Sequence, residues 1–422
     1  MGRNYYTIAE VTDYGPFITK IILPMPSVVK ADAVYKNCFS VYVERKDRNG
    51  KVLELPKSWM ARDDKEPSQG YVEITDAYPS CFYGNRKEEA EYVTLEMKYG
   101  PRYTLSAAIS APNGVNEFVI SDYRITQTAV IETEGGKISG LVYDLCAGRR
   151  MPVADEFRHG RSSYELPLNY GYFVPQTGNG KRPLIIWLHG AGEGGQDPTV
   201  AYAGNKVTNL ATEEIQKKFG GAYLLVPQTP TFWLNDGSGQ YGRSGKSMYT
   251  EALKALIDEF IEKNDAAIDR NRIYIGGDSN GGFMTMRMTV NYPDFFAGVF
   301  PVCEALYDER ISDQDIENIK NVPIWFTHAK NDPVVKPEET VVPTYERLIK
   351  AGAKNVHFTF WDKITDLHGL FVDENGEPFE YIGHFAWIPM LNDDCKVDYD
   401  EKPVVVDGKE VTLLDWLALQ HK

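Results

Sequence analysis

The strongest constraint on the fold is an alternation of apolar runs with helical patterns from about residue 165 onward. The runs are nearly continuous in apolar residues, as expected of parallel strands buried on both faces. They lie at residues 184–188, 222–226, 272–275, 299–302, 324–328 and 356–361. Helical periodicity fills the intervals, most clearly at 248–262 and 283–291. We therefore expect a doubly wound, mostly parallel α/β sheet with helices on both faces.

The first 140 residues follow a different pattern. Short runs rich in Val, Ile, Tyr and Phe are separated by clusters of Gly, Pro, Asn and Asp, without a convincing amphipathic helix. The runs lie at 18–23, 39–44, 71–75, 92–98 and 117–125. They predict an all-β sandwich of the Ig-like kind, in architecture only, because the Cys…Trp…Cys signature is missing. We predict a sandwich domain at 1–140, a connection at 141–165 and an α/β domain at 166–422.

Composition excludes several classes of protein. The 422 residues carry 45 Lys and Arg against 60 Asp and Glu, a net charge of −15 that repels nucleic acid and anionic membranes. Apolar runs are too short to span a bilayer, and the N-terminal residues do not resemble a signal peptide. We expect a cytoplasmic protein, or a secreted one if a signal peptide has been removed. The five scattered cysteines form no CxxC pair and predict neither a disulfide framework nor a metal site.

A candidate nucleophile lies at residues 277–281, Gly-Asp-Ser-Asn-Gly, which fit the pattern G-x-S-x-G. A strand-like run leads into these residues, and a helical pattern begins directly after Ser279. This is the strand–turn–helix arrangement of a nucleophile elbow, whose glycines avoid side-chain clashes across a strained turn. The alternative is a glycine-rich turn with an incidental serine.

A second motif, Trp-Leu-His-Gly-Ala-Gly-Glu-Gly-Gly at 187–195, follows the apolar run at 184–188. Its small residues would let the backbone N–H of Ala191 join that of Asn280 in an oxyanion hole. Residues 190–195 also fit the dinucleotide fingerprint G-x-G-x-x-G. That fingerprint should open a helix at once, whereas Gln-Asp-Pro follows here, so the pair of motifs favours a hydrolase.

The order Ser, acid, His along the chain predicts the other two catalytic groups. Asp332 lies just past the strand-like run 324–328 and is the candidate acid. Four histidines follow it: His357, His368, His384 and His421. His357 falls within a strand and His421 lies next to the C-terminus. Spacing leaves His368 and His384 open, with a slight preference for His384.

Together these motifs resemble α/β hydrolases of the polyhydroxybutyrate-depolymerase-like esterase and predicted-peptidase group, in particular members with an N-terminal Ig-like domain. The stretches that carry the resemblance are 188–193, 226–228, 268–274, 279–282, 292–293, 331–335 and 383–387, with a softer match at 10–16. The family places its histidine in Gly-His-x-x-Trp, so the resemblance implies His384. Family elbows often carry Met or Gln after the serine, and this chain has Asn280.

The resulting hypothesis is a serine carboxylesterase that uses Ser279, Asp332 and His384 and needs no cofactor or metal. Expected substrates are small-molecule esters or esterified carbohydrates with short acyl or hydroxycinnamoyl (feruloyl) groups. Glu193 and Trp233 are candidate substrate contacts, Trp233 because its glycine-rich loop, 231–242, follows a strand. An ordinary core tryptophan is the alternative for Trp233.

Two other functions stay open at this point. A serine peptidase would use the same triad, and a non-catalytic protein could keep the fold and bind a polysaccharide or a partner through the Ig-like domain. For that domain, packing against the hydrolase domain, self-association into a homo-oligomer and shaping of the cleft entrance are equally consistent with the sequence.

Overall fold

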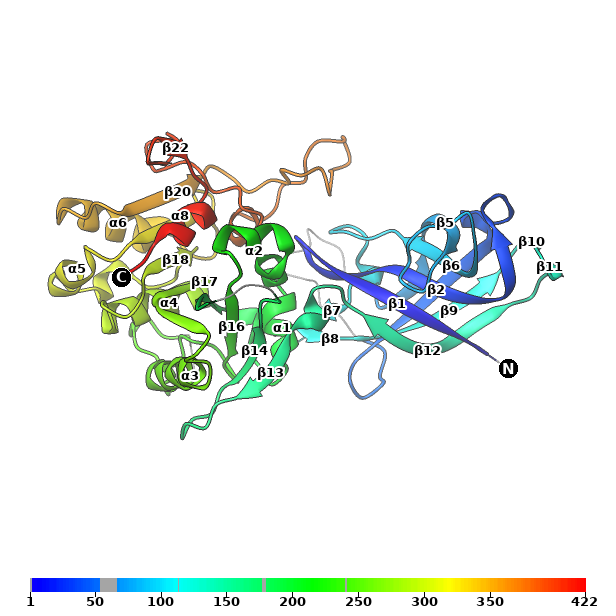
Figure 1. Cartoon of the computed structure of the whole chain (residues 1–422), viewed down its shortest axis with the longest axis horizontal. Coiled ribbons are helices and arrows are strands. Elements are labelled where there is room, and N and C mark those ends of the chain that lie inside the picture. The colour runs from blue at the N-terminus through cyan, green and yellow to red at the C-terminus, as the bar shows by residue number, and fades with distance from the viewer. Residues whose placement is uncertain (1, 54–66, 113, 177–179, 240) are drawn as a thin grey trace. The chain divides into compact units, whose positions relative to one another are not determined.

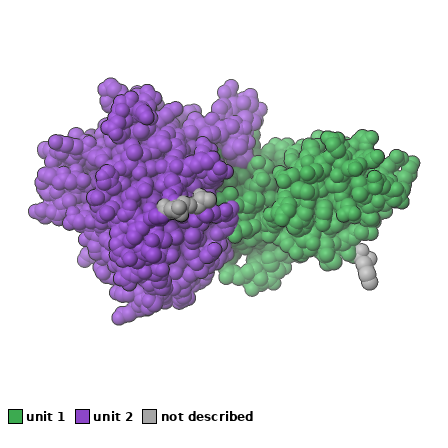
Figure 2. All heavy atoms as spheres, in the orientation of Figure 1, with its two compact units in different colours: residues 1–155 green, residues 156–422 purple. Residues whose placement is uncertain are grey.

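The computed structural model describes residues 2–53, 67–112, 114–176, 180–239 and 241–422 (Figure 1). The chain divides into two compact units, Met1–Asp155 and Glu156–Lys422, which Figure 2 colours green and purple. They are called the N-terminal unit and the C-terminal unit below. Among the described residues, no helix is long and apolar enough to cross a membrane.

The N-terminal unit is built from strands, as its sequence predicts. Its ten-stranded sheet, counted over the described residues, contains β1 (Arg3–Thr12), β2 (Gly15–Lys30), β3 (Phe39–Lys46), β4 (Gln69–Val72), β5 (Ile74–Ser80), β6 (Glu89–Met97), β9 (Ile120–Gln127), β10 (Ile131–Thr133), β11 (Gly136–Ile138) and β12 (Val142–Arg150). Its main order is β11-β10-β2-β1-β12-β9-β3-β4, and β6 pairs with β2 and β5. A small pair, β7 (Ile109–Ser110) and β8 (Glu117–Phe118), lies outside that sheet, and three 3-10 turns connect strands: η1 (Ala31–Ala33), η2 (Lys36–Cys38) and η3 (Thr104–Ser106).

Two features of this unit differ from the predicted runs. The run 71–75 is interrupted at Glu73, between β4 and β5, and the run 117–125 is interrupted at Val119, between β8 and β9. Strand β1 was not predicted, because polar residues break its apolar pattern, yet it pairs with both β2 and β12. The ends of these strands are determined by which residues pair with neighbouring strands, and not by the local alternation of apolar residues.

The C-terminal unit holds an eight-stranded sheet within the described residues. Its strands are β13 (Arg158–Arg161), β14 (Asn169–Phe173), β15 (Arg182–Leu188), β16 (Tyr223–Gln228), β17 (Ile268–Asp278), β18 (Gly298–Val302), β19 (Ile324–Ala329) and β20 (Val356–Trp361). Their order is β13-β14-β16-β15-β17-β18-β19-β20, antiparallel through β13, β14 and β16 and parallel from β16 onward. The six predicted runs are the six parallel strands.

Residues 141–165, expected to be a connection, contribute a strand to each sheet. Strand β12 pairs with β1 and β9 in the N-terminal unit, whereas β13 pairs with β14 in the C-terminal unit. Polar residues such as Arg149, Arg150 and Arg158 hide both strands from a search for apolar runs. These strands form because neighbouring strands, β1 and β9 for β12 and β14 for β13, supply their hydrogen-bond partners.

Helices cover both faces of the C-terminal sheet (Figure 1). They are α1 (Pro198–Ala203), α2 (Glu213–Phe219), α3 (Thr250–Lys263), α4 (Asn280–Asn291), α5 (Asp313–Ile319), α6 (Val341–Lys350), α7 (Trp387–Leu391) and α8 (Leu413–Leu419), with 3-10 turns η4 (Ala154–Glu156), η5 (Ala191–Glu193), η6 (Val207–Ala211), η7 (Asp308–Arg310) and η8 (Pro337–Glu339). Alternate strand residues face opposite sides. Ile186 joins the core with Leu253 of α3, and Trp325 packs against Trp416 of α8 at a ring distance of 5.6 Å. A short hairpin of β21 (Val405–Val406) and β22 (Lys409–Glu410) precedes α8.

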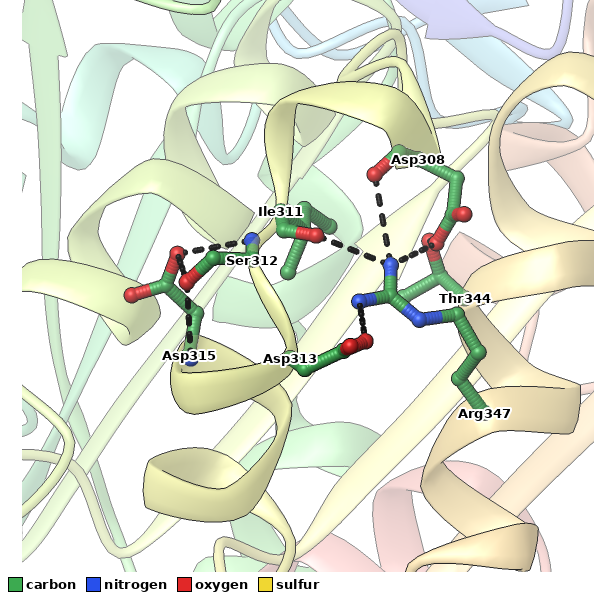
Figure 3. Close-up of polar contacts among 7 residues, drawn as sticks. All are labelled: Asp308, Ile311, Ser312, Asp313, Asp315, Thr344 and Arg347. Atoms are coloured by element: carbon green, nitrogen blue, oxygen red, sulfur yellow. Dashed lines mark hydrogen bonds and ion pairs between the residues drawn. The ribbon is translucent and has the colours of Figure 1, made fainter.

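One arginine bonds helix α6 to the turn before α5 (Figure 3). Arg347 Nη1 donates to a carboxylate oxygen of Asp308 at 2.8 Å and to the carbonyl oxygen of Ile311 at 2.9 Å. Its Nη2 donates to Asp313 at 2.8 Å. A guanidinium fork suits this arrangement because its donors are rigidly spaced.

Candidate active site

Ser279 lies at the junction of β17 and α4. Its backbone has φ 53° and ψ −109°, a conformation that is rare for a residue with a side chain. The N–H of Ser279 donates to the carbonyl oxygen of Val302 on β18 at 2.9 Å. Asp278 and Asn280 are buried on either side, whereas Ser279 is half-buried. The elbow therefore presents the serine hydroxyl at the carboxyl edge of the sheet.

The two motif glycines are required by close packing against β15. A Cβ at position 277 would lie 2.4 Å from the carbonyl oxygen of Leu188, and a Cβ at position 281 would lie 1.9 Å from the same oxygen. Backbone atoms cannot move aside as a flexible side chain can. The pattern G-x-S-x-G thus has a direct steric cause in this chain.

Three predicted residues meet in a chain of hydrogen bonds. His384 Nε2 lies 2.9 Å from Ser279 Oγ, and His384 Nδ1 lies 2.7 Å from Asp332 Oδ2. His368, the other histidine that spacing left open, is largely exposed and pairs with Asp394 at 3.0 Å instead. Because a carboxylate only accepts, the proton on His384 lies on Nδ1, and Nε2 is left to accept from the serine.

Asp332 is surrounded by donors. Its Oδ1 accepts the backbone N–H groups of Val334 and Val335 at 2.8 and 3.0 Å. Its Oδ2 accepts from His384 and from His328 Nε2, the latter at 3.0 Å. Burial alone would raise the pKa of Asp332, but hydrogen bonds from His328 and His384 outweigh it and hold the pKa well below its usual range. The carboxylate is therefore ionised at neutral pH.

Ala191 and Asn280, the predicted oxyanion-hole residues, each open a helical turn. Ala191 is the first residue of η5, and Asn280 is the first residue of α4. The first N–H groups of a helix have no acceptor within it. The close approach of Gly281 to Leu188 brings the start of α4 against the end of β15, the strand that leads to Ala191.

The side chain of His189 makes two hydrogen-bond contacts that stabilise the loop carrying Ala191. Its Nδ1 lies 2.6 Å from the carbonyl oxygen of Gly190, and its Nε2 accepts the N–H of Thr229 at 3.1 Å. Burial lowers the pKa of His189 to about 4, so the ring is neutral at pH 7. Gln228 Nε2 adds bonds to the carbonyl oxygens of Glu193 and Asp197, both at 2.9 Å.

The two candidate substrate contacts are buried. Trp233 has no exposed surface, and its ring lies against His189 and Tyr249 at ring distances of 5.3 and 6.1 Å. The structure therefore places Trp233 in the core, the alternative that the sequence offered, where a large apolar ring is stable. Its backbone N–H donates to Asn280 Oδ1. Glu193 is 4% exposed and belongs to the inside of the loop at η5 rather than to an open surface.

Asp278, the buried residue before Ser279, was not among the candidate residues of the sequence analysis. Its Oδ2 accepts from Asn205 Nδ2 at 3.2 Å and lies 2.6 Å from the place where a Cβ of Gly190 would stand. Burial and the negative charge of Glu193 raise its pKa well above the usual range. The motif accepts any residue before the serine, so the pattern carried no signal for it. Within the described residues, no three His, Cys, Asp or Glu side chains gather as metal ligands.

The family comparisons divide the chain in two. The esterase Ig-like N-terminal domain family matches residues 4–140, and the Phospholipase/Carboxylesterase family matches residues 171–365. A crystal structure of a thermostable esterase superposes with a TM-score of 0.74 at 24% sequence identity, covering 99% of both chains. The chain combines an esterase Ig-like N-terminal domain with a Phospholipase/Carboxylesterase domain of the α/β-hydrolase fold.

Curated relatives of this α/β hydrolase match shorter stretches. A poly(3-hydroxybutyrate) depolymerase of Ralstonia pickettii is 31% identical over 31% of the chain and 28% of its own length. Feruloyl esterase B of Neurospora crassa is 33% identical over 29% of the chain and 39% of its own length. The alignments thus span well under half of these relatives. The solved structure, at 24% identity, shows that the fold of the whole chain is shared.

Proposed function

We propose that this α/β hydrolase cleaves carboxylic esters through an acyl-enzyme on Ser279, with His384 as general base and Asp332 as its partner. The observation that carries the proposal is the continuous pair of hydrogen bonds, 2.9 and 2.7 Å, from Ser279 Oγ through His384 to Asp332. The half-buried position of Ser279 between two buried neighbours supports access to the hydroxyl.

In the first half-reaction, Ser279 Oγ attacks the ester carbonyl carbon while its proton passes to His384 Nε2. Asp332 holds the imidazole in the required tautomer and stabilises the imidazolium that forms. The N–H groups of Ala191 and Asn280 donate to the oxyanion of the tetrahedral intermediate. Collapse of the intermediate expels the alcohol, which takes the proton from His384.

In the second half-reaction, water replaces the alcohol. His384 Nε2 removes a proton from that water as it attacks the acyl carbon, and Ser279 leaves with a proton returned by His384. The carboxylic acid is released and the triad regains its starting protonation state. The catalytic groups in both half-reactions are side chains and backbone N–H groups of the protein, and water is the co-reactant.

The substrates that we propose are small-molecule esters with short acyl or hydroxycinnamoyl groups, including feruloyl groups and esterified carbohydrates. Similarity to a protein named feruloyl esterase B supports the hydroxycinnamoyl class. Because Trp233 is buried, the acyl pocket must be formed by other residues.

The test is hydrolysis of p-nitrophenyl acetate, butyrate and octanoate and of methyl ferulate by the wild type and by Ser279→Ala. Ser163→Ala is the matched control, because its hydroxyl bonds to Glu259 at 2.7 Å rather than to a histidine. We expect Ser279→Ala to lose at least about a thousandfold in kcat and Ser163→Ala to match the wild type.

Ester and amide analogues of one acyl group separate an esterase from a peptidase of the same fold. Faster cleavage of the ester, by more than its greater chemical reactivity explains, would support the proposal. Full activity of Ser279→Ala, or a folded wild type that cleaves none of the esters and resists a fluorophosphonate probe, would refute it.

A further inference from the structure

The catalytic carboxylate is shared by two histidines. Asp332 Oδ2 lies 2.7 Å from His384 Nδ1 and 3.0 Å from His328 Nε2, so one oxygen accepts from both rings. His328 comes from β19, four residues before Asp332, whereas His384 comes from a loop 52 residues after it. The arrangement is a His–Asp–His contact in which only one histidine reaches the serine.

The second acceptor of His328 fixes the position of its proton. His328 Nε2 also lies 3.1 Å from the carbonyl oxygen of Val335, and a carbonyl oxygen can only accept. The proton must therefore lie on Nε2, between Val335 and Asp332. His328 is a donor to the catalytic carboxylate and is not a second base.

His328 has no exposed surface, and its Nδ1 has no hydrogen-bond partner among the described residues. A side chain used only for packing could be apolar here, whereas burying an imidazole with one unsatisfied nitrogen costs stability. The compensating contact is the one to Asp332 and Val335. This combination favours a role in the site over a role in the core.

We infer that His328 is a positioning residue that holds Asp332 Oδ2 in line with His384 and takes up part of its negative charge. The inference rests on the proposed function. By sharing Oδ2, His328 limits how strongly the carboxylate stabilises the His384 imidazolium. Hydrogen bonds from both histidines help keep Asp332 ionised despite its burial.

Removing the donor should therefore change the pH dependence as well as the rate. With His328 gone, more of the Asp332 charge faces His384, and the imidazolium form of His384 becomes more stable. Cys303, after β18, is also near this carboxylate: burial and then the negative charge of Asp332 raise the pKa of its thiol well above the usual range, so the thiol stays uncharged. The acidic limb of kcat/KM should move to higher pH.

The experiment measures kcat/KM for p-nitrophenyl acetate from pH 5 to 9, with active sites counted by a fluorophosphonate probe. His328→Met keeps the bulk without a donor, and His328→Gln keeps an amide donor near the position of Nε2. The matched control is His357→Gln on the neighbouring strand β20, where the ring bonds to Asp398 at 2.6 Å, away from Ser279. His328→Asn replaces the Met variant if that variant does not fold.

We expect His328→Met to lose about ten- to a hundredfold in kcat/KM, mostly in kcat, with the acidic limb raised by about half a pH unit or more. His328→Gln should recover most of the rate and the wild-type limb, and His357→Gln should leave both unchanged. An unshifted limb in His328→Met, or equal losses in the Met and Gln variants, would overturn the inference while ester hydrolysis stands. A wild type that neither hydrolyses esters nor reacts with the probe would overturn both.

Discussion

The Cα of Gly281 lies so close to Leu188 that a Cβ on residue 281 would stand 1.9 Å from the Leu188 carbonyl oxygen. The contact joins the first turn of α4 to the end of β15. This contact sets the distance between the nucleophile elbow, at the start of α4, and the loop of Ala191, which follows β15.

Gly281→Ala is expected to separate these two segments. A methyl group would push α4 away from β15, at a cost of about 1–3 kcal/mol in the free energy of unfolding and at least tenfold in kcat/KM. Gly148→Ala is the control, because its Cβ would meet only Tyr6 at an ordinary 3.6 Å. Urea unfolding and ester hydrolysis measure both quantities. Wild-type activity in Gly281→Ala would contradict the steric account.

Asp332→Asn tests the acid of the proposed triad. The amide can donate to His384 and so favour the wrong tautomer, and we expect kcat to fall about ten-thousandfold with little change in KM. His368→Asn removes the histidine that bonds to Asp394 and should leave kcat unchanged. Steady-state kinetics on p-nitrophenyl butyrate give kcat and KM for both variants. A large loss of kcat in His368→Asn would reverse the assignment of the base.

The side chain of Asn280 accepts a hydrogen bond from the backbone of Trp233, apart from the oxyanion-hole role that we propose for the Asn280 N–H. Asn280→Ala leaves the buried N–H of Trp233 without its acceptor, which should cost about 1–3 kcal/mol of stability. Trp233→Phe keeps that backbone bond and deletes an indole N–H that has no partner among the described residues. Thermal unfolding of both variants separates the bond from the packing. Equal stability of Asn280→Ala and the wild type would show that the bond contributes nothing.

Glu304 predicts a pH dependence of stability. It lies just past β18 with 1% of its surface exposed, and burial raises its pKa to about 8. Because the pKa of Glu304 is higher in the folded than in the unfolded protein, its contribution to folding stability is fully present below the unfolded-state pKa. That contribution is lost as the pH rises through about 8. Between about pH 5 and 8 the wild type should lose roughly 1 kcal/mol per pH unit from this group.

Glu304→Gln should remove this loss, because an amide does not titrate. The amide oxygen can still accept the N–H of Leu306, which Glu304 accepts at 2.7 Å. Urea unfolding at pH 5, 6.5 and 8 gives the comparison, with the exposed Glu309→Gln as control. Parallel curves for the wild type and Glu304→Gln would refute a raised pKa at this position.

The fold class of the C-terminal unit could be predicted from the sequence, because burial on both faces leaves an apolar signature in each parallel strand. The sequence also predicted Ser279 as the nucleophile, since an elbow needs glycines at fixed positions, and Gly277 and Gly281 do pack closely against Leu188. Strands β1, β12 and β13 were not predicted, because they lack a clear apolar pattern. They are stabilised by hydrogen bonds to neighbouring strands. The predicted boundaries of the connection at 141–165 stay a prediction.

Spacing along the chain left His368 and His384 nearly equal as the partner of Ser279. The resemblance implied His384, and the hydrogen bond to Ser279 is a feature of the tertiary structure. Both histidines lie in loops beyond β20, and the loop paths place one beside Asp394 and the other between Ser279 and Asp332. The burial of Trp233 and the contact of His328 with Asp332 were likewise decided there. Such contacts depend on which strand ends lie side by side, and no local pattern of residues encodes that adjacency.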